Sequence, residues 1–176
     1  MLQITIPSAE LYDEQTNKFV KVKEQTLCLE HSLVSLSKWE SRWHKPFVND
    51  NRKTTEETRD YIRCMTLTQN VNPYTYYALT DNIIRQVQDY IDDSMTATWF
   101  SQQSETKTKK QQITNELVYY WMFKLGIPKE CEKWHFNRLI TLIKVYDAQE
   151  QKTKPMTPSE RAALNAARKK QYNTRG

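Results

Sequence analysis

Glycine is scarce in this chain, and the scarcity excludes a group of nucleotide-binding motifs. The sequence of 176 residues contains only Gly126 and Gly176. Phosphate-binding loops of the Walker and Rossmann types need several glycines within a short stretch, because their backbone approaches the phosphates closely. The sequence therefore offers neither type of loop.

Cysteine is also scarce, and its spacing excludes other classes of protein. The three cysteines, Cys28, Cys64 and Cys131, are odd in number and far apart, and no CxxC pair occurs. This pattern predicts neither a disulfide framework nor a zinc ribbon. Free cysteines at such spacing are typical of a reduced, intracellular setting.

Long hydrophobic runs are missing as well. No apolar stretch approaches the roughly 20 residues that a membrane-spanning helix needs. The first residues lack a basic start followed by an apolar run, so we expect no signal peptide and no membrane partner. Hydrophobic residues make up 38% of the chain, but 5 Trp, 10 Tyr and 5 Phe supply large side chains for a core.

Positive charge is concentrated at the C-terminal end. Residues 151–176 contain seven basic side chains and one acidic side chain, Glu160, a net charge of +6. Because the whole chain carries +5, residues 1–150 carry −1. A basic segment of this kind suits an acidic partner, either nucleic acid or an acidic protein surface, although a solvated helix end has the same composition.

The N-terminal segment has the alternation of a β structure. Leu2, Ile4 and Ile6 alternate with polar residues, and a second apolar series follows around Val20 and Val22. A turn-like stretch at residues 13–17 separates the two. We predict a β-hairpin or a small antiparallel sheet over residues 2–24.

Residues 25–147 have helical periodicity and are predicted to form a helical bundle. In residues 30–47, a stripe that includes Trp39 and Trp43 recurs at three- and four-residue spacing and ends at Pro46. We place both tryptophans mainly in the core, and we expect His44 and Lys45, just after the stripe, to be free for a partner.

Local signals mark the helices that follow. Thr54 begins a capping box, a short turn opens at Pro73, and Thr80 caps another helix. The helix at residues 114–125 is apolar nearly all round, which predicts a central buried helix that Gly126 terminates. A further helix is predicted to begin at Pro128. The polar residues 101–112 are predicted to form a mobile loop.

The predicted fold is therefore mainly α, with residues 1–147 as a single globular domain. Residues 148–156 are predicted to be a linker, and a second capping box at residues 157–160 starts a basic helix at residues 161–172. This helix has little to bury, so we expect it to be exposed or to dock on a partner. Its candidate partner-binding residues are Arg161, Leu164, Arg168, Lys169 and Lys170.

Catalytic and metal chemistry finds little support in the sequence. Cys131 and His135 have the spacing of two metal ligands on one helix, but the sequence indicates no further ligands. Cys28 and His31 could be drawn as a nucleophile and base, yet no oxyanion loop accompanies them. The clusters of acidic residues are more typical of helix ends. We predict no catalytic, cofactor-binding or metal-binding residue and no enzymatic activity.

Several motifs resemble those of a known family. They are LEHSLVSLSKWESRWHKPF (residues 29–47), YIRCMTLTQN (61–70), MTATWF (95–100), ECEKWHFNRL (130–139) and LNAARKKQ (164–171). Together they cover nearly the whole chain. The chain resembles small proteins encoded by siphophages and prophages of Gram-positive bacteria. Such proteins are similar in size and genomic setting to tail assembly chaperones.

The resemblance implies a non-enzymatic function in virion morphogenesis. It predicts a protein of the host cytoplasm that binds the tape measure protein and keeps it soluble until the tail tube polymerises. The alternatives are a structural virion protein, such as a tail or head–tail connector component, or a nucleic-acid-binding accessory protein that uses the basic tail. A homo-oligomer is left open.

Overall fold

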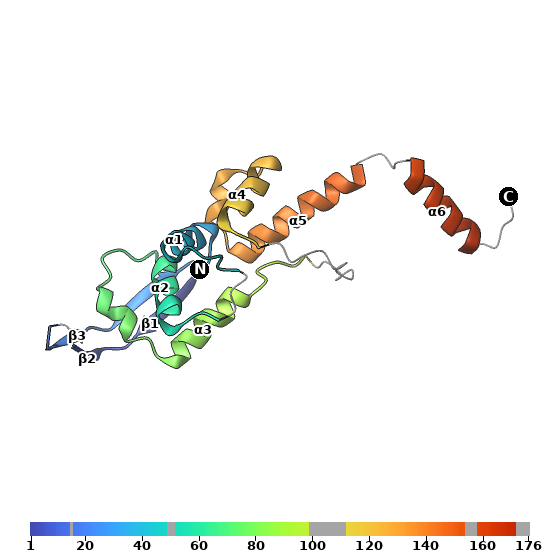
Figure 1. The fold of residues 1–176 in the computed structure, drawn as a ribbon. Coiled ribbons are helices and arrows are strands. Elements are labelled where there is room, and N and C mark those ends of the chain that lie inside the picture. Colours follow the sequence, from blue (N-terminus) through green and yellow to red (C-terminus); the bar gives the residue numbers. More distant parts are fainter. Residues whose placement is uncertain (15, 49–51, 99–111, 154–157, 172–176) are drawn as a thin grey trace. The chain divides into compact units, whose positions relative to one another are not determined.

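The computed structural model describes residues 1–176 except residues 15, 49–51, 99–111, 154–157 and 172–176. The chain divides into two compact units, Met1–Ile143 and Lys144–Gly176. Helices predominate, and the strands form two small antiparallel pairs (Figure 1). The mainly α fold predicted from the sequence is confirmed at this level.

The strands pair differently from the predicted arrangement. β2 (Ala9–Asp13) and β3 (Lys18–Val22) form a hairpin, but β1 (Leu2–Ile6) pairs antiparallel with β4 (Gln25–Leu29). The prediction that helical structure begins at residue 25 is therefore wrong. Leu27 and Leu29 are fully buried and alternate with less buried neighbours, which is the period of a strand.

The first helix is shorter than its apolar stripe. α1 (Leu33–Trp43) begins at a capping box in which Ser32 is the N-cap. It ends at His44, whose φ of 53° is left-handed, so the helix stops two residues before Pro46. Trp39 is fully buried, which confirms its predicted place in the core, and Trp43 is half-buried.

The local signals of the middle region are confirmed. Thr54 caps α2 (Thr55–Met65) through the predicted capping box, and Pro73 opens the 3₁₀ turn η1 (Pro73–Tyr77). Thr80 caps α3 (Asp81–Asp92) by accepting a hydrogen bond from the backbone of Ile83. These caps work because each side-chain oxygen satisfies an amide that the first helical turn leaves unpaired.

The core of Met1–Ile143 gathers around α1. Figure 1 shows α1 between α2 and α4 (Asn115–Lys124), with the β1–β4 pair beside them. Fully buried side chains come from the strands, from α1 and α2, from α4 and from the helix α5 (Phe136–Thr153). These include Ile6, Leu27, Leu36, Trp39, Ile62, Met65, Val118 and Leu139.

α4 is not the central buried helix that its composition predicted. It buries Val118 and Met122, but Tyr120 is 58% exposed and Phe123 is 67% exposed. Its end is as predicted, because Gly126 adopts a φ of 66° that favours glycine. One side of α4 therefore carries two aromatic side chains that stay more than half exposed among the described residues.

The C-terminal helices differ from prediction in their boundaries. Pro128 is the N-cap of a 3₁₀ turn, η2 (Lys129–Lys133), and α5 begins only after it. α5 continues to Thr153, so residues 148–153, predicted as linker, are helical. α6 spans Pro158–Gln171. The mobile loop predicted at residues 101–112 and the cap predicted at Thr157 lie almost wholly outside the described residues.

Candidate functional site

Two exposed aromatic side chains and one half-buried one, Tyr119, lie together on one side of α4. Tyr119 stacks on Phe123 with ring centroids 6.4 Å apart, and Tyr120 is exposed beside them. The hydroxyl of Tyr119 donates a hydrogen bond of 2.9 Å to Glu132, which fixes its ring. We call Tyr119, Tyr120 and Phe123 the α4 aromatic face. Exposed aromatic side chains of this kind are typical of protein-binding surfaces.

A buried carboxylate sets the position of α4. Glu40, on α1, accepts hydrogen bonds from the backbone amide and the side-chain amide of Asn115, at 2.8 Å and 2.6 Å. Its other oxygen accepts from the backbone of Phe47 at 2.8 Å. Glu40 is 7% exposed, so the three charge-assisted bonds compensate its loss of hydration. The aromatic face is therefore presented by a fixed helix.

The two residues predicted to serve a partner after α1 have different environments. His44 is exposed and borders a shallow pocket of about 360 Å³ with Glu40 and Asn115. Lys45 is not free, which corrects the prediction for that residue. Its ammonium pairs with the carboxylate of Glu57 and lies 5.8 Å from the ring centroid of Trp39.

The Lys45–Glu57 pair has a local structural role. Hydrogen bonding from Lys45, and then from the backbone of Thr54, lowers the pKa of Glu57 below its usual range. Because Glu57 also closes the capping box of α2, Lys45 supports the start of that helix.

The candidate residues of the C-terminal helix are only partly described. Arg161 and Arg168 lie on α6 and are exposed. The side chains of Leu164, Lys169 and Lys170 lie outside the described part of the chain. The basic surface predicted for this helix thus remains a prediction.

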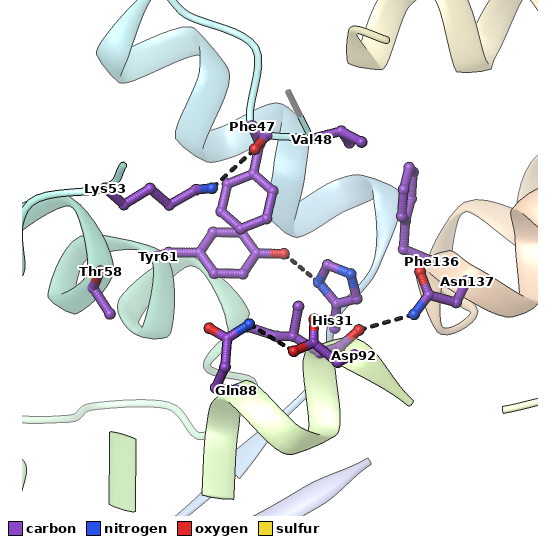
Figure 2. A pocket seen from close by; sticks show the side chains of 11 residues that line it. His31, Phe47, Val48, Lys53, Thr58, Tyr61, Gln88, Asp92, Phe136 and Asn137 are labelled. Atoms are coloured by element: carbon purple, nitrogen blue, oxygen red, sulfur yellow. Dashed lines mark hydrogen bonds between the residues drawn. The ribbon is translucent and has the colours of Figure 1, made fainter. Parts of the chain in front are cut away.

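A pocket of about 590 Å³ lies within Met1–Ile143 (Figure 2). It is lined by residues of α2, α3 and α5 and of the segments next to α1. Apolar walls come from Phe47, Val48, Ile91 and Phe136, and polar groups from His31, Lys53, Thr58, Tyr61, Gln88, Asp92 and Asn137. Its size falls in the range of small-ligand and side-chain sites.

A buried hydrogen-bonded pair lies at the wall of this pocket. Nδ1 of His31 is bonded to the hydroxyl of Tyr61 (Figure 2). The Tyr61 hydroxyl also lies 3.4 Å from the hydroxyl of Ser35. Burial raises the pKa of Tyr61 well above its usual value, so the phenol keeps its proton. Since the phenol is the more acidic partner and the contact with His31 is the shorter one, we assign Tyr61 as donor to Nδ1.

A second histidine lies against the first. The rings of His31 and His135 are 5.1 Å apart between centroids, at an interplanar angle of 67°. Nε2 of His135 donates a hydrogen bond of 2.9 Å to the carbonyl of Tyr90. Nδ1 of His135 is buried and has no hydrogen-bond partner among the described residues, which is unusual for a buried polar atom.

The geometry does not assemble the catalytic or metal arrangements considered for the sequence. Burial, then the charges of His135 and Lys53, lower the pKa of His31 to about 3, so it is a weak proton acceptor near neutral pH. Cys131 lies in η2, whereas His135 follows the end of that turn. Within the described residues, no group of three or more His, Cys, Asp and Glu side chains could hold a metal ion.

Sequence reasoning missed both the aromatic face and the His31–Tyr61 pair. The pair joins residues 30 positions apart, and no local spacing signals such a contact. The aromatic face lies in a helix whose composition suggested burial. A search for helices with more apolar surface than one neighbour can cover would have indicated it.

Comparison of the chain with protein-family models, with curated proteins and with solved structures gives no match. Among the described helices, none is long and apolar enough to cross a membrane.

Proposed function

We propose that this protein is a non-enzymatic tail assembly chaperone that binds the tape measure protein of a siphophage in the host cytoplasm. The exposed aromatic face of α4 is the observation that carries the proposal. The motif resemblance described above supplies the partner, because proteins of that kind are similar to chaperones for this long helical protein.

The aromatic face suits a helical partner physically. A long helix that is not yet enclosed by the tail tube exposes apolar stripes, and an amphipathic helix docks by laying such a stripe on an apolar surface. Tyr120 and Phe123 are each more than half exposed, so each offers on the order of 100 Å² for burial. At about 25 cal/mol per Å², each ring would contribute roughly 2 kcal/mol to the contact.

The basic C-terminal helix α6 is proposed as a second contact. Arg161 and Arg168 are exposed on it. The sequence of α6 has small apolar residues beside these cations, so it could order further on an acidic partner surface at an entropic cost. This contact would raise the rate of association and make it depend on salt.

Co-expression with the tape measure protein of the same genome tests the proposal. The wild-type chain should bring that partner into the soluble fraction as a complex. The variant Phe123→Ser should lower the recovered complex at least several-fold, because the exposed ring is lost. Phe19→Ser is the matched control, since Phe19 is 69% exposed on the β2–β3 hairpin and Phe123 is 67% exposed.

Two outcomes would contradict the proposal. The partner stays insoluble in the presence of the wild-type chain, or both serine variants lower recovery equally. Mass spectrometry of purified virions separates a chaperone from a structural virion protein: a chaperone should be absent or scarce, whereas a structural protein is present in fixed copy number.

A further inference from the structure

We infer that the pocket beside His31 binds a carboxylate group carried by an acidic peptide segment. The inference goes beyond the proposed function and does not rest on it, because it concerns a different surface from the α4 aromatic face. It follows from the hydrogen-bond donors that converge on the pocket and from the walls that enclose them.

The first donor is the imidazole of His31. The side chain is 2% exposed, borders the pocket, and accepts from Tyr61 at Nδ1. A neutral imidazole that accepts at one nitrogen carries its proton on the other. Nε2–H makes no hydrogen bond to another described residue. It is not among the fully buried unpaired atoms of the described residues, so it has access to the pocket that His31 lines. A donor in this position can bind an acceptor that enters the pocket.

The start of α5 supplies further donors. The backbone amide of Phe136 donates to the carbonyl of His31 at 2.7 Å, and the amide of Leu139 donates to the carbonyl of His135 at 3.0 Å. The two amides between them, of Asn137 and Arg138, belong to the first turn, which has no intrahelical acceptors. No acidic residue in that turn compensates the helix dipole.

Lys53 adds a positive charge at the pocket wall. Its ammonium donates a hydrogen bond of 2.9 Å to the backbone carbonyl of Phe47 (Figure 2). The same ammonium lies 4.0 Å from the centroid of the Phe47 ring. The same charge helps to lower the pKa of His31, which indicates a positive potential at the imidazole. The ammonium of Lys53, the N-terminus of α5 and the Nε2–H group of His31 together favour an acceptor that carries a negative charge.

The remaining walls favour a carboxylate on a peptide over a phosphate. Asp92 lines the pocket, is exposed, and accepts a hydrogen bond from Gln88 at 3.0 Å. The negative charge of the Asp92 carboxylate repels a phosphate dianion. Its oxygens can nevertheless accept a hydrogen bond from a peptide N–H group. Phe47 and Phe136 provide apolar surface for a neighbouring side chain. An acidic residue next to an aromatic or aliphatic one therefore matches the pocket.

The test measures binding of blocked dipeptides by NMR of the full chain labelled with ¹⁵N-histidine. The probes are N-acetyl-Phe-Glu-amide and its uncharged analogue N-acetyl-Phe-Gln-amide. The His31 signals are assigned by their loss in His31→Gln. The acidic dipeptide should shift the Nε2 signal of His31 saturably. The uncharged dipeptide should bind roughly tenfold more weakly, because charge-assisted hydrogen bonds are lost.

Three variants test the charges that the inference assigns to the pocket. Lys53→Met should weaken binding of the acidic dipeptide about tenfold, and Lys129→Met, which removes an exposed lysine of η2, should leave it unchanged. Asp92→Asn should tighten binding about twofold to threefold, since it removes a like charge from an exposed position. This last variant keeps the test informative if loss of Lys53 disturbs the fold.

Several outcomes would overturn the inference. Equal binding of the two dipeptides would show that the carboxylate is not recognised. Weaker binding in Asp92→Asn, or no change in Lys53→Met that remains folded, would show that the charges do not act as assigned. Sodium acetate that binds as tightly as the acidic dipeptide would show that a peptide is not the source of the carboxylate.

Discussion

Two groups of aromatic side chains in this protein have opposite environments. In the buried group, the ring centroids of Trp39 and Phe47 are 5.2 Å apart, and those of Phe47 and Tyr61 are 3.9 Å apart. In the α4 aromatic face, Tyr119 and Phe123 also stack, but Phe123 is 67% exposed. Aromatic content alone therefore does not distinguish a core from a surface.

The difference lies in the neighbours of the two helices. α1 contacts both α2 and α4, so its apolar stripe and its flanks are covered from two sides. α4 contacts α1 and buries Val118 and Met122, and Asn115 at its start bonds to Glu40 of α1. Tyr120 and Phe123, on another side of α4, remain more than half exposed and form surface. α4 therefore carries more apolar side chains than it buries against the rest of the described chain.

The largest expected effect is the loss of Trp39 from the buried group. Trp39→Ala should lower the free energy of unfolding by about 3–5 kcal/mol, because it leaves a large cavity and the Trp39 indole no longer donates to the carbonyl of Glu57. Guanidinium denaturation measures the change. Trp39→Phe, which keeps a ring, should cost less. A loss below about 1 kcal/mol in the alanine variant would contradict the central role of this ring.

The second effect is a pH dependence that originates at His31. Burial lowers its pKa from 6.5 to about 3, so between these values the unfolded chain binds a proton that the folded chain does not. The free energy of unfolding should therefore fall as pH decreases, by about 1.4 kcal/mol per pH unit. Denaturation curves at pH 6 and pH 4 measure this slope.

His31→Gln is the control for this prediction. Glutamine does not titrate, and its side-chain oxygen can still accept from Tyr61. The variant should lack the part of the slope that is due to His31. Parallel pH profiles of the wild type and the variant would contradict the assignment of His31 as a buried neutral imidazole.

The third effect concerns the link between the two helices. Glu40→Gln should cost about 2 kcal/mol, because one carboxylate oxygen becomes an NH₂ group that faces buried donors. Hydrogen exchange of the α4 amides should become faster. Glu130→Gln, at an exposed position, should change stability by less than about 0.5 kcal/mol. Unchanged exchange in the Glu40 variant would show that the carboxylate does not hold α4.

The smallest effect on stability is expected on the exposed face. Phe123→Ser should lower the free energy of unfolding by less than about 1 kcal/mol, since most of the ring is already in water. It should also reduce the fluorescence of a dye that binds apolar surface. A loss as large as that of Trp39→Ala would mean that Phe123 is part of the core, and the contrast between the two groups would fail.

Features that depend on neighbouring residues were readable from the sequence. The caps at Thr54 and Thr80 and the end at Gly126 are as predicted, because a side-chain oxygen or a missing Cβ acts within one helical turn. The place of Trp39 in the core also followed from periodicity. Such signals require no knowledge of distant parts of the chain.

Features that depend on distant contacts were not readable in the same way. β1 pairs with β4 across the intervening hairpin, from Leu2 opposite Leu29 to Ile6 opposite Gln25. Lys45 pairs with Glu57 on the next helix, although its position after α1 suggested a free side chain. In each case the partner lies outside the range over which periodicity or capping carries information.

The sequence by itself determined that this protein is mainly helical, where α2, α3 and α4 start, and that Trp39 enters the core, because local hydrogen bonds and hydrophobic periodicity act over a few residues. The tertiary structure decided which side of α4 is covered and which residues enclose the pocket at His31. The physical reason is that burial is a property of neighbours. A helix that is apolar all round becomes core or binding surface according to what packs against it.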